Sequence, residues 1–232
     1  MTDSMKELEK VPAKDKDLAW EEISVEHIVQ DHWIDFRKSA FRYPDGRVFE
    51  PFYSYSRKDY VVIVASDVDG QYLCVRQFRQ GIKEVTTEFP AGGVERTDGK
   101  EYRGAGAVGA GATGVAGSVG EETSAGAEAS AAEELLETAK RELMEETGYE
   151  SDEWEHLLTI PSNATIADNY ATVFRAKNCR LVAGQDLDET EVLNIQKYSA
   201  DEIENMIYNG QFQQSVHVMA WLLAKEKERN TK

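Results

Sequence analysis

The sequence predicts an α+β fold in which a small antiparallel β region precedes a larger domain of strands and helices. Three observations lead to this prediction. Aromatic-rich, alternating runs flank a turn at 44–46, short apolar runs follow between 60 and 79, and helical patterns occupy 133–149 and most of 199–227. The 232 residues suit one domain of moderate size with an appendage, and 41% hydrophobic residues suffice for a core.

Charge and composition exclude several classes of function. A formal net charge of −17 argues against a basic surface for nucleic acid, so an anionic substrate would need arginines and a metal close at hand. Cys74 and Cys179 are interpreted as reduced core thiols. The four histidines show no metal spacing and are interpreted as structural or surface residues.

The charged N-terminus has no apolar signal region, and no apolar run approaches the roughly 18 residues of a membrane span. We therefore expect a cytoplasmic protein without membrane contact. Residues 1–18 are predicted to form a flexible tail. Residues 19–57 are predicted to form the β region, with alternation around Ile23, Val25 and Ile28 and with one buried face.

A larger domain is expected from 58 to 228. Residues 60–66 are a continuous apolar run, typical of a central strand, and 71–79 form the next strand after a turn. Residues 90–93 read Pro-Ala-Gly-Gly, a tight backbone feature where a ligand can approach the main chain.

A long insertion is expected at about 97–129. Its segment 104–120 holds seven of the 17 glycines, which is typical of a flexible, low-complexity loop. Lengthening a loop from about 5 to about 40 residues costs roughly 2 kcal/mol in closure entropy, so the fold can tolerate it.

A helix is predicted to begin after the insertion, with Ser130 as N-cap and Glu133 at the third helical position. It carries an apolar stripe and is expected to end at Gly148. Strands are predicted at 154–160, 170–176 and 192–199, and helices at 199–208 and 213–227. The inward residues of the last helix are expected to be Val216, Met219, Ala220, Leu222 and Leu223.

The predicted helix at 133–149 concentrates carboxylates. Glu142 and Glu146 lie at i and i+4 with Glu145 beside them, and like charges at this spacing destabilise a helix by roughly 0.2–0.5 kcal/mol per pair. A divalent cation would offset this repulsion, and Mg²⁺ prefers carboxylate oxygens and often bridges to substrate phosphates. The alternative is a solvated acidic face.

The run E-x7-R-E-L-M-E-E-T-G-Y from Glu133 to Tyr149 resembles the C-terminal part of the Nudix box, G-x5-E-x7-R-E-U-x-E-E-x-G-U. Every fixed position after the first glycine is matched. Gly92 corresponds to that glycine, but forty residues separate it from Glu133 where the pattern has five. Further segments are similar to the ADP-ribose pyrophosphatase branch, namely 75–79, 88–92 and 186–191.

The resemblance implies a Nudix-type α/β/α sandwich with a mixed sheet and a homodimer formed through the N-terminal β region. It implies Mg²⁺, with Mn²⁺ as an alternative, and hydrolysis of ADP-ribose or a related nucleoside diphosphate sugar to two monophosphates. The expected metal ligands are Glu142, Glu146, Glu145 and the carbonyl of Ala91, and Arg141 would hold Glu145. The expected substrate-binding residues are Trp33 and Phe49 for adenine, together with Arg76, Arg79 and Glu88.

Two questions stay open at the level of sequence. Glu145 either binds the metal or acts on the attacking water, and the general base is Asp168, Glu189 or Glu191, because Asn169 stands where the branch often has a glutamate. The substrate could also be GDP-mannose or a nucleoside triphosphate, and the chain could be a non-catalytic nucleotide sensor. A sensor would commonly lack the box carboxylates, which this chain keeps.

Overall fold

The structure, a computed structural model, describes residues 15–95, 124–189 and 191–230. The chain divides into two units. The first comprises residues 1–57 with 165–167, and the second comprises residues 58–164 with 168–232. The predicted tail up to 14 and most of the predicted insertion, 97–123, lie outside the described residues.

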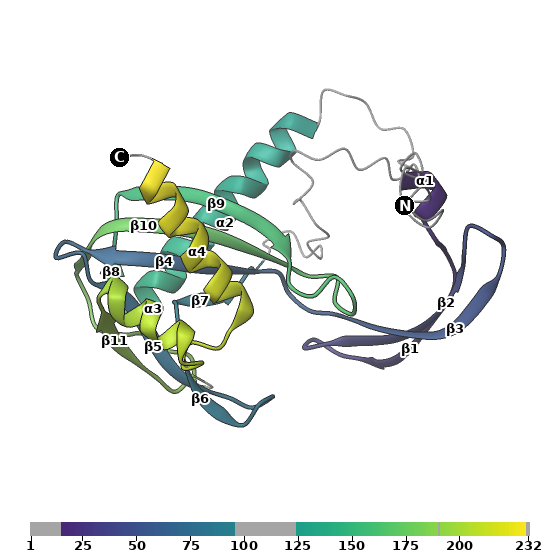
Figure 1. Cartoon of the computed structure of the whole chain (residues 1–232), viewed down its shortest axis with the longest axis horizontal. Coiled ribbons are helices and arrows are strands. Elements are labelled where there is room, and N and C mark those ends of the chain that lie inside the picture. The colour runs from purple at the N-terminus through teal and green to yellow at the C-terminus, as the bar shows by residue number, and fades with distance from the viewer. Residues whose placement is uncertain (1–14, 96–123, 190, 231–232) are drawn as a thin grey trace, which may run out of the picture. The chain divides into compact units, whose positions relative to one another are not determined.

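The first unit is a three-stranded antiparallel sheet in the order β1-β2-β3 (Figure 1). Its strands are β1 Glu21–Gln30, β2 Asp35–Arg42 and β3 Val48–Ser56. The hairpin predicted around 44–46 is therefore confirmed, and β1 adds a third strand. One turn of helix, α1 Asp15–Leu18, precedes the sheet and occupies the last four residues of the predicted tail.

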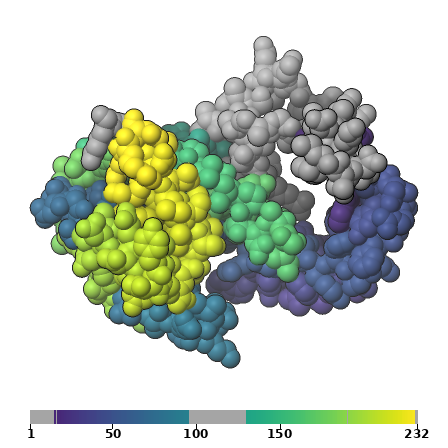
Figure 2. All heavy atoms as spheres, in the orientation of Figure 1, coloured from purple at the N-terminus to yellow at the C-terminus, as the bar shows by residue number. Residues whose placement is uncertain are grey.

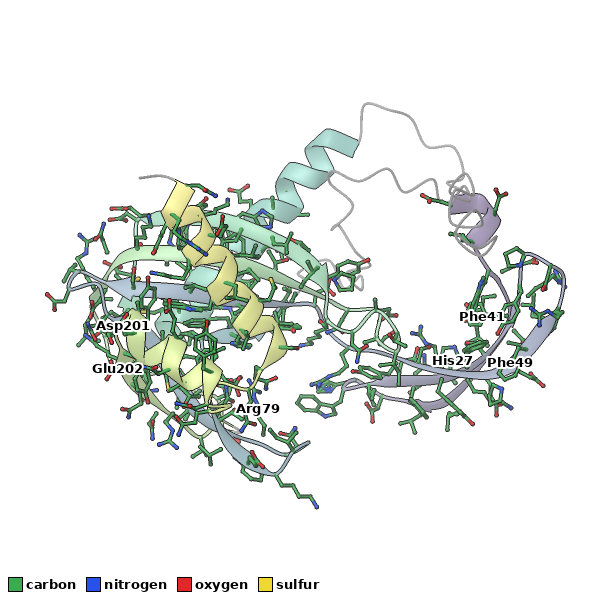
Figure 3. The ribbon with its side chains drawn as sticks, in the orientation of Figure 1. His27, Phe41, Phe49, Arg79, Asp201 and Glu202 are labelled. Atoms are coloured by element: carbon green, nitrogen blue, oxygen red, sulfur yellow. The ribbon has the colours of Figure 1, made fainter. Side chains whose placement is uncertain are left out.

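Aromatic rings cluster on this first sheet. Phe41 and Phe49 are paired across β2 and β3 (Figure 3), and the rings of Trp20, Tyr43 and Phe52 pack with them. Every residue of β1 is exposed, including the predicted alternating set Ile23, Val25 and Ile28. Within this unit, the apolar residues of β1 thus have no covering layer.

The second unit is built on a mixed sheet with the main order β11-β5-β4-β10-β8. Strands β4 and β10 run parallel at its centre, and β6, β7 and β9 pair with β5, β4 and β10. The bounds are β4 Tyr60–Asp67, β5 Tyr72–Arg79, β6 Glu84–Glu88, β7 Ala91–Gly93, β8 Tyr149–Glu150, β9 Glu153–Pro161, β10 Tyr170–Leu181 and β11 Leu193–Tyr198.

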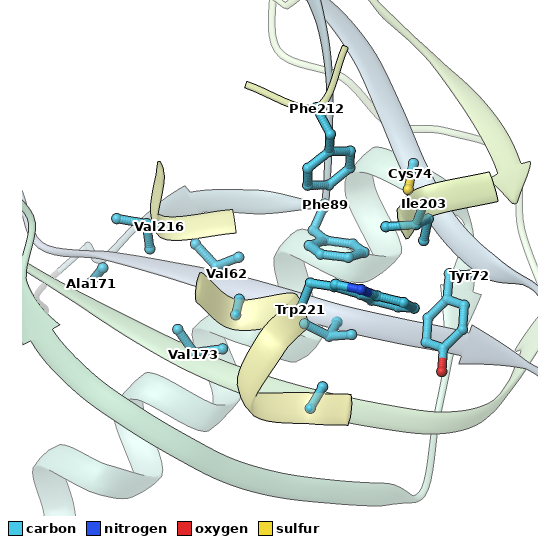
Figure 4. Close-up of a cluster of buried hydrophobic side chains, with 13 residues drawn as sticks. Val62, Tyr72, Cys74, Phe89, Ala171, Val173, Ile203, Phe212, Val216 and Trp221 are labelled. Carbon is cyan, nitrogen blue, oxygen red and sulfur yellow. The ribbon is translucent and has the colours of Figure 1, made fainter. Parts of the chain in front are cut away.

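Helices cover both faces of this sheet: α2 Ser124–Thr147 on one side, α3 Ala200–Tyr208 and α4 Ser215–Asn230 on the other (Figure 1). Figure 2 shows the face over which α3 and α4 lie, in yellow-green and yellow. The side chains of β4 alternate between the two layers. Val61 and Ile63 pack with α2, whereas Val62 and Val64 pack with Phe89 and Trp221 beneath α3 and α4 (Figure 4). A strand buried on both faces explains the continuous apolar run at 60–66, and the α+β sandwich with a mixed sheet is confirmed.

Helix α2 begins at Ser124, six residues before the predicted N-cap, so the assignments of Ser130 as N-cap and of 124–129 as loop were wrong. Alanine has the highest helix propensity, and the alanine-rich residues that precede Ser130 continue the helix. The predicted stop is confirmed: Gly148 has φ +73°, and its amide donates to the Met144 carbonyl at 2.7 Å.

Helix α4 differs from the prediction on its inward face. Leu222 is 57% exposed, and His217, Trp221 and Ala224 are buried together with Val216 and Ala220. The predicted apolar stripe was therefore centred about one residue away from the face of α4 that is buried. In the described residues, no helix is long and apolar enough to span a bilayer.

Candidate active site

The site forms where the second half of α2 meets β7. Gly92 lies against the carboxylate of Glu142: a Cβ built on Gly92 would be 1.9 Å from the Glu142 carboxyl carbon and about as close to both oxygens. Only a residue without a side chain leaves this space open. The two halves of the motif, separated by forty residues in the sequence, are therefore in direct contact in the fold.

A hydrogen bond fixes the same junction one residue earlier. The Ala91 amide donates to Glu146 Oε2 at 3.0 Å, and the Glu146 side chain is 2% exposed. The Pro90 carbonyl in turn accepts from the Ile63 amide of the central strand at 2.9 Å. The backbone at 90–92 is thus held between the sheet and α2, next to two buried carboxylates.

Arg141 connects two of the three site carboxylates. Its Nη2 lies 2.6 Å from Glu142 Oε1, and its Nη1 lies 2.5 Å from Glu145 Oε2. Glu142 is buried, whereas the Glu145 side chain is 36% exposed. The planar guanidinium fork allows one arginine to hold both groups, which a lysine could not do with the same geometry.

Burial sets the electrostatics of the site. It raises the pKa of Glu142 to about 7 and that of Glu146 to about 8, against partial compensation by Arg141 and by the Ala91 amide respectively. The negative charge of Glu191 raises both pKa values further. Burial therefore disfavours the ionised form of both carboxyl groups, and a positive charge beside them would favour it.

The donor set fits a hard divalent cation. Glu142, Glu145 and Glu146 supply only carboxylate oxygens, and Mg²⁺ usually binds one or two carboxylates while keeping several waters. Within 15–95, 124–189 and 191–230, no three His, Cys, Asp or Glu side chains converge closely enough to enclose a metal by themselves. A site of this kind suits an ion that also takes water and substrate oxygens.

Arg79 lies near these carboxylates, since the charges of Glu88 and Glu146 both raise its pKa against the effect of burial. Its Nε donates to Glu88 Oε1 at 2.8 Å and its Nη2 donates to Glu88 Oε2. Glu88 is fully buried and also accepts from Thr86 Oγ1. Burial opposes ionisation of Glu88, but these donors outweigh it and keep its pKa below the usual value. Glu88 thus fixes the orientation of the Arg79 guanidinium through two hydrogen bonds.

Other predicted residues are less clearly joined to the site. Arg76 is exposed and, three residues from Arg79 on β5, points to the opposite face of the strand. Asp168 and Glu189 are exposed, whereas Glu191 is half-buried and acts electrostatically on Glu142 and Glu146.

The two predicted adenine-stacking residues belong to the first unit. Trp33 lies in the turn between β1 and β2, near the C-terminal end of β3, and is 69% exposed. Phe49 lies near the N-terminal end of β3 and is 53% exposed. The strand register places about six residues of β2 between them, or roughly 20 Å. A single copy of this sheet cannot place both rings against one adenine.

Sequence reasoning missed one residue near the site. His217 of α4 is buried, and its Nδ1 accepts a hydrogen bond from the Phe89 amide at 3.1 Å. The helical spacing of 217, 220, 221 and 224 indicates a buried stripe, but nothing in that spacing shows which backbone amide the ring meets.

Known proteins resemble this chain in sequence and in fold. No family model matches the chain. An ADP-ribose pyrophosphatase of Bacillus subtilis (strain 168) is 22% identical over 193 residues, which cover 83% of this chain and 85% of that protein. The crystal structure of an ADP compounds hydrolase has a TM-score of 0.68 at 16% identity and covers 92% of this chain and 97% of that chain. The chain is thus similar in sequence and fold to ADP-ribose pyrophosphatase-like Nudix proteins, as the motif predicted.

Proposed function

We propose that this chain, which is similar to ADP-ribose pyrophosphatases in sequence and fold, hydrolyses the diphosphate linkage of ADP-ribose or a related nucleoside diphosphate sugar. The products would be two monophosphates, and the reaction would depend on Mg²⁺ or Mn²⁺. The observation that carries the proposal is the contact of Gly92 and Ala91 with Glu142 and Glu146, which joins the two halves of the interrupted motif.

Glu142, Glu146 and Glu145, with the carbonyl of Ala91, would hold the cation. A cation held there would neutralise diphosphate charge and would lower the pKa of a bound water molecule. The chain contributes two buried carboxylates whose burial favours a compensating positive charge. Glu145, the more exposed of the three, is free to join them or to act on the attacking water.

Arg141 and Arg79 would have different tasks. Arg141 orients Glu142 and Glu145 through one guanidinium. Arg79 would receive a phosphate or ribose oxygen, with Glu88 holding its guanidinium from behind. Arg76, on the opposite face of β5, is the weaker candidate for the same contact.

Three acidic residues are candidates for the general base: Asp168, Glu189 and Glu191. A base must come within hydrogen-bond reach of the attacking water. Glu191 is half-buried and its negative charge raises the pKa of both Glu142 and Glu146, so it is the first of the three to test by mutation.

Trp33 and Phe49 would stack the adenine from two copies of the chain, because they lie at opposite ends of one sheet. A homodimer formed through the first unit would also cover the exposed apolar residues of β1. We propose that this homodimer acts in the cytoplasm.

The test is a panel of nucleotide sugars and nucleoside triphosphates assayed with Mg²⁺ on the full chain. We expect AMP and a sugar monophosphate from ADP-ribose. Release of pyrophosphate from triphosphates would instead favour the alternative substrate class, and folded protein that turns over no compound would refute the proposal.

A matched pair of variants locates the activity in the described site. Glu146→Gln keeps an oxygen that can accept from the Ala91 amide but removes the negative charge, so we expect the fold to persist and turnover to fall by about 100-fold or more. Glu137→Gln, on the exposed face of α2 where it pairs with Lys140, should leave the rate unchanged. Equal rates for Glu146→Gln and the unmodified chain would show that the site lies elsewhere.

A further inference from the structure

His217 occupies an unusual place for an ionisable side chain. It lies on α4, is 4% exposed, and its ring is parallel to the Phe89 ring, with the ring centres 6.4 Å apart. Phe89 packs in turn against Phe212 and Trp221, in the apolar layer beneath α3 and α4 (Figure 4). An apolar side chain would fill this volume without the cost of burying polar nitrogens.

The hydrogen bond from the Phe89 amide determines the form of the ring. Because Nδ1 accepts, the proton of the neutral ring must be on Nε2. Burial lowers the pKa of His217 to about 4, so the ring is neutral at pH 7. Phe89 lies between β6 and β7, where the chain leaves Glu88 and enters Pro90 and Ala91. The ring thus supports the backbone that leads directly into the site.

The second ring nitrogen, Nε2, faces Glu88, the carboxylate that binds Arg79. His217 Nε2 lies 3.9 Å from Glu88 Oε2, too far for a hydrogen bond but close enough for a dipole to act on a buried carboxylate. Gln214, the residue immediately before α4, donates through Nε2 to Glu88 Oε1 at 3.4 Å. The segment 214–217, at the entry to α4, therefore places two polar side chains near Glu88, on the carboxylate that binds Arg79.

We propose that His217 is a positioning residue for the hydrolytic reaction, acting through two separate contacts. Through Nδ1 it fixes the backbone that carries Ala91 to the metal site, and through the Nε2–H dipole it acts on the buried Glu88 carboxylate that orients the Arg79 guanidinium. The inference rests on the proposed function, and it assigns to the C-terminal helix a part in catalysis that its sequence does not indicate.

Two conservative variants separate these contacts. The amide oxygen of His217→Asn can take the place of Nδ1 and accept from Phe89, but its side chain is too short to reach toward Glu88. The longer amide of His217→Gln can take the place of Nε2. A contact that positions a group binding the substrate in ground and transition states changes KM, whereas one that positions the reacting centre changes kcat.

For ADP-ribose hydrolysis we expect His217→Asn to raise KM about 10-fold with kcat within about threefold of the unmodified chain. We expect His217→Gln to lower kcat about 10-fold with KM little changed. The control is Ile203→Ala, which opens a cavity in the same buried layer without touching the network. At a temperature where it remains folded, it should keep both constants.

A purely structural role predicts a different outcome. Both histidine variants would then behave like Ile203→Ala: they would lose stability but keep both constants at a temperature where they remain folded, and the separation of KM from kcat would be absent. That result would overturn the proposal.

A second readout does not depend on turnover. In ¹⁵N-labelled protein, the Arg79 Nε–H signal, identified with Arg79→Lys, should shift in His217→Asn and less in His217→Gln. The Phe89 amide signal should show the reverse order. If the unmodified chain hydrolyses no substrate, the proposed function fails, but these signals still decide the two contacts of His217; unchanged signals in both variants would refute them.

Discussion

Replacing Gly92 with alanine tests the junction between β7 and α2 most directly. The new Cβ would lie 1.9 Å from the carboxyl carbon of Glu142, whereas ordinary van der Waals contact begins at about 3.4 Å. The φ angle of Gly92 is not positive, so the backbone itself accepts alanine without strain. The strain must therefore be relieved by the flexible end of the Glu142 side chain.

This displacement separates activity from stability. Moving a reacting or positioning group by about 1 Å can cost roughly 100-fold in rate, which corresponds to about 2.7 kcal/mol of activation free energy. The free energy of unfolding should change by no more than about 1 kcal/mol, because the displaced carboxylate moves away from a buried position and alanine restricts the unfolded chain. We expect kcat for ADP-ribose to fall about 100-fold with an almost unchanged urea midpoint.

The neighbouring glycine provides the control. A Cβ on Gly93 would meet only Lys58 Cδ at 3.7 Å, an ordinary contact. Gly93→Ala should therefore keep both activity and stability. Full activity in Gly92→Ala would refute the contact between Gly92 and Glu142 as part of the site, and equal losses in both variants would point to a general effect on β7.

Three further predictions follow from other contacts. Arg141→Lys should lower kcat about 10-fold or more with little change in stability, since the single nitrogen of lysine cannot donate from the two positions that Nη1 and Nη2 occupy. Lys140→Ala, which loses only an exposed ion pair, should keep kcat. Equal kcat values for Arg141→Lys and the unmodified chain would contradict the bridging role. The folded-state pKa of His217 is about 4 against 6.5 when unfolded, so stability is fully present above pH 6.5 and falls as the pH drops towards 4, by on the order of 3 kcal/mol. Urea midpoints measured across this range should show a smaller slope for His217→Gln, and an identical slope would refute the assignment. Gly148→Ala should lower the free energy of unfolding by about 2 kcal/mol or more, because φ is +73° and the Cβ would lie 2.2 Å from the Ala183 carbonyl oxygen. Gly210→Ala, with φ +70° and no atom near the new Cβ, should lower it by only about 1 kcal/mol. Equal losses in the two variants would show that the clash with the Ala183 oxygen does not contribute.

Much of the fold could be predicted because its signals are local. The continuous apolar run of β4 follows from burial on both faces, and the stripe Leu135, Ala139 and Leu143 follows from helical periodicity. The start of α2 could not be predicted, because a capping pattern at Ser130 competes with alanine-rich sequence on its N-terminal side. The inward face of α4 was misjudged at Leu222, since only packing decides where a stripe with several apolar neighbours is centred.

The candidate site divides in the same way. The residue types and spacing of Arg141, Glu142, Glu145 and Glu146 are written in the sequence, because one helix displays them all on neighbouring positions. The sequence likewise determined the resemblance to the Nudix pattern and the glycine to which the helix should return.

Only the tertiary structure decided whether Gly92 and the glutamates of α2 meet. The contact of Gly92 with Glu142 joins segments on either side of a long insertion, and the position of His217 behind Glu88 joins α4 to β6. Such contacts depend on how the sheet brings distant elements together, and no local periodicity encodes them. The physical reason is that side-chain spacing fixes the faces of an element, whereas the neighbour of each face is set by the packing of the whole domain.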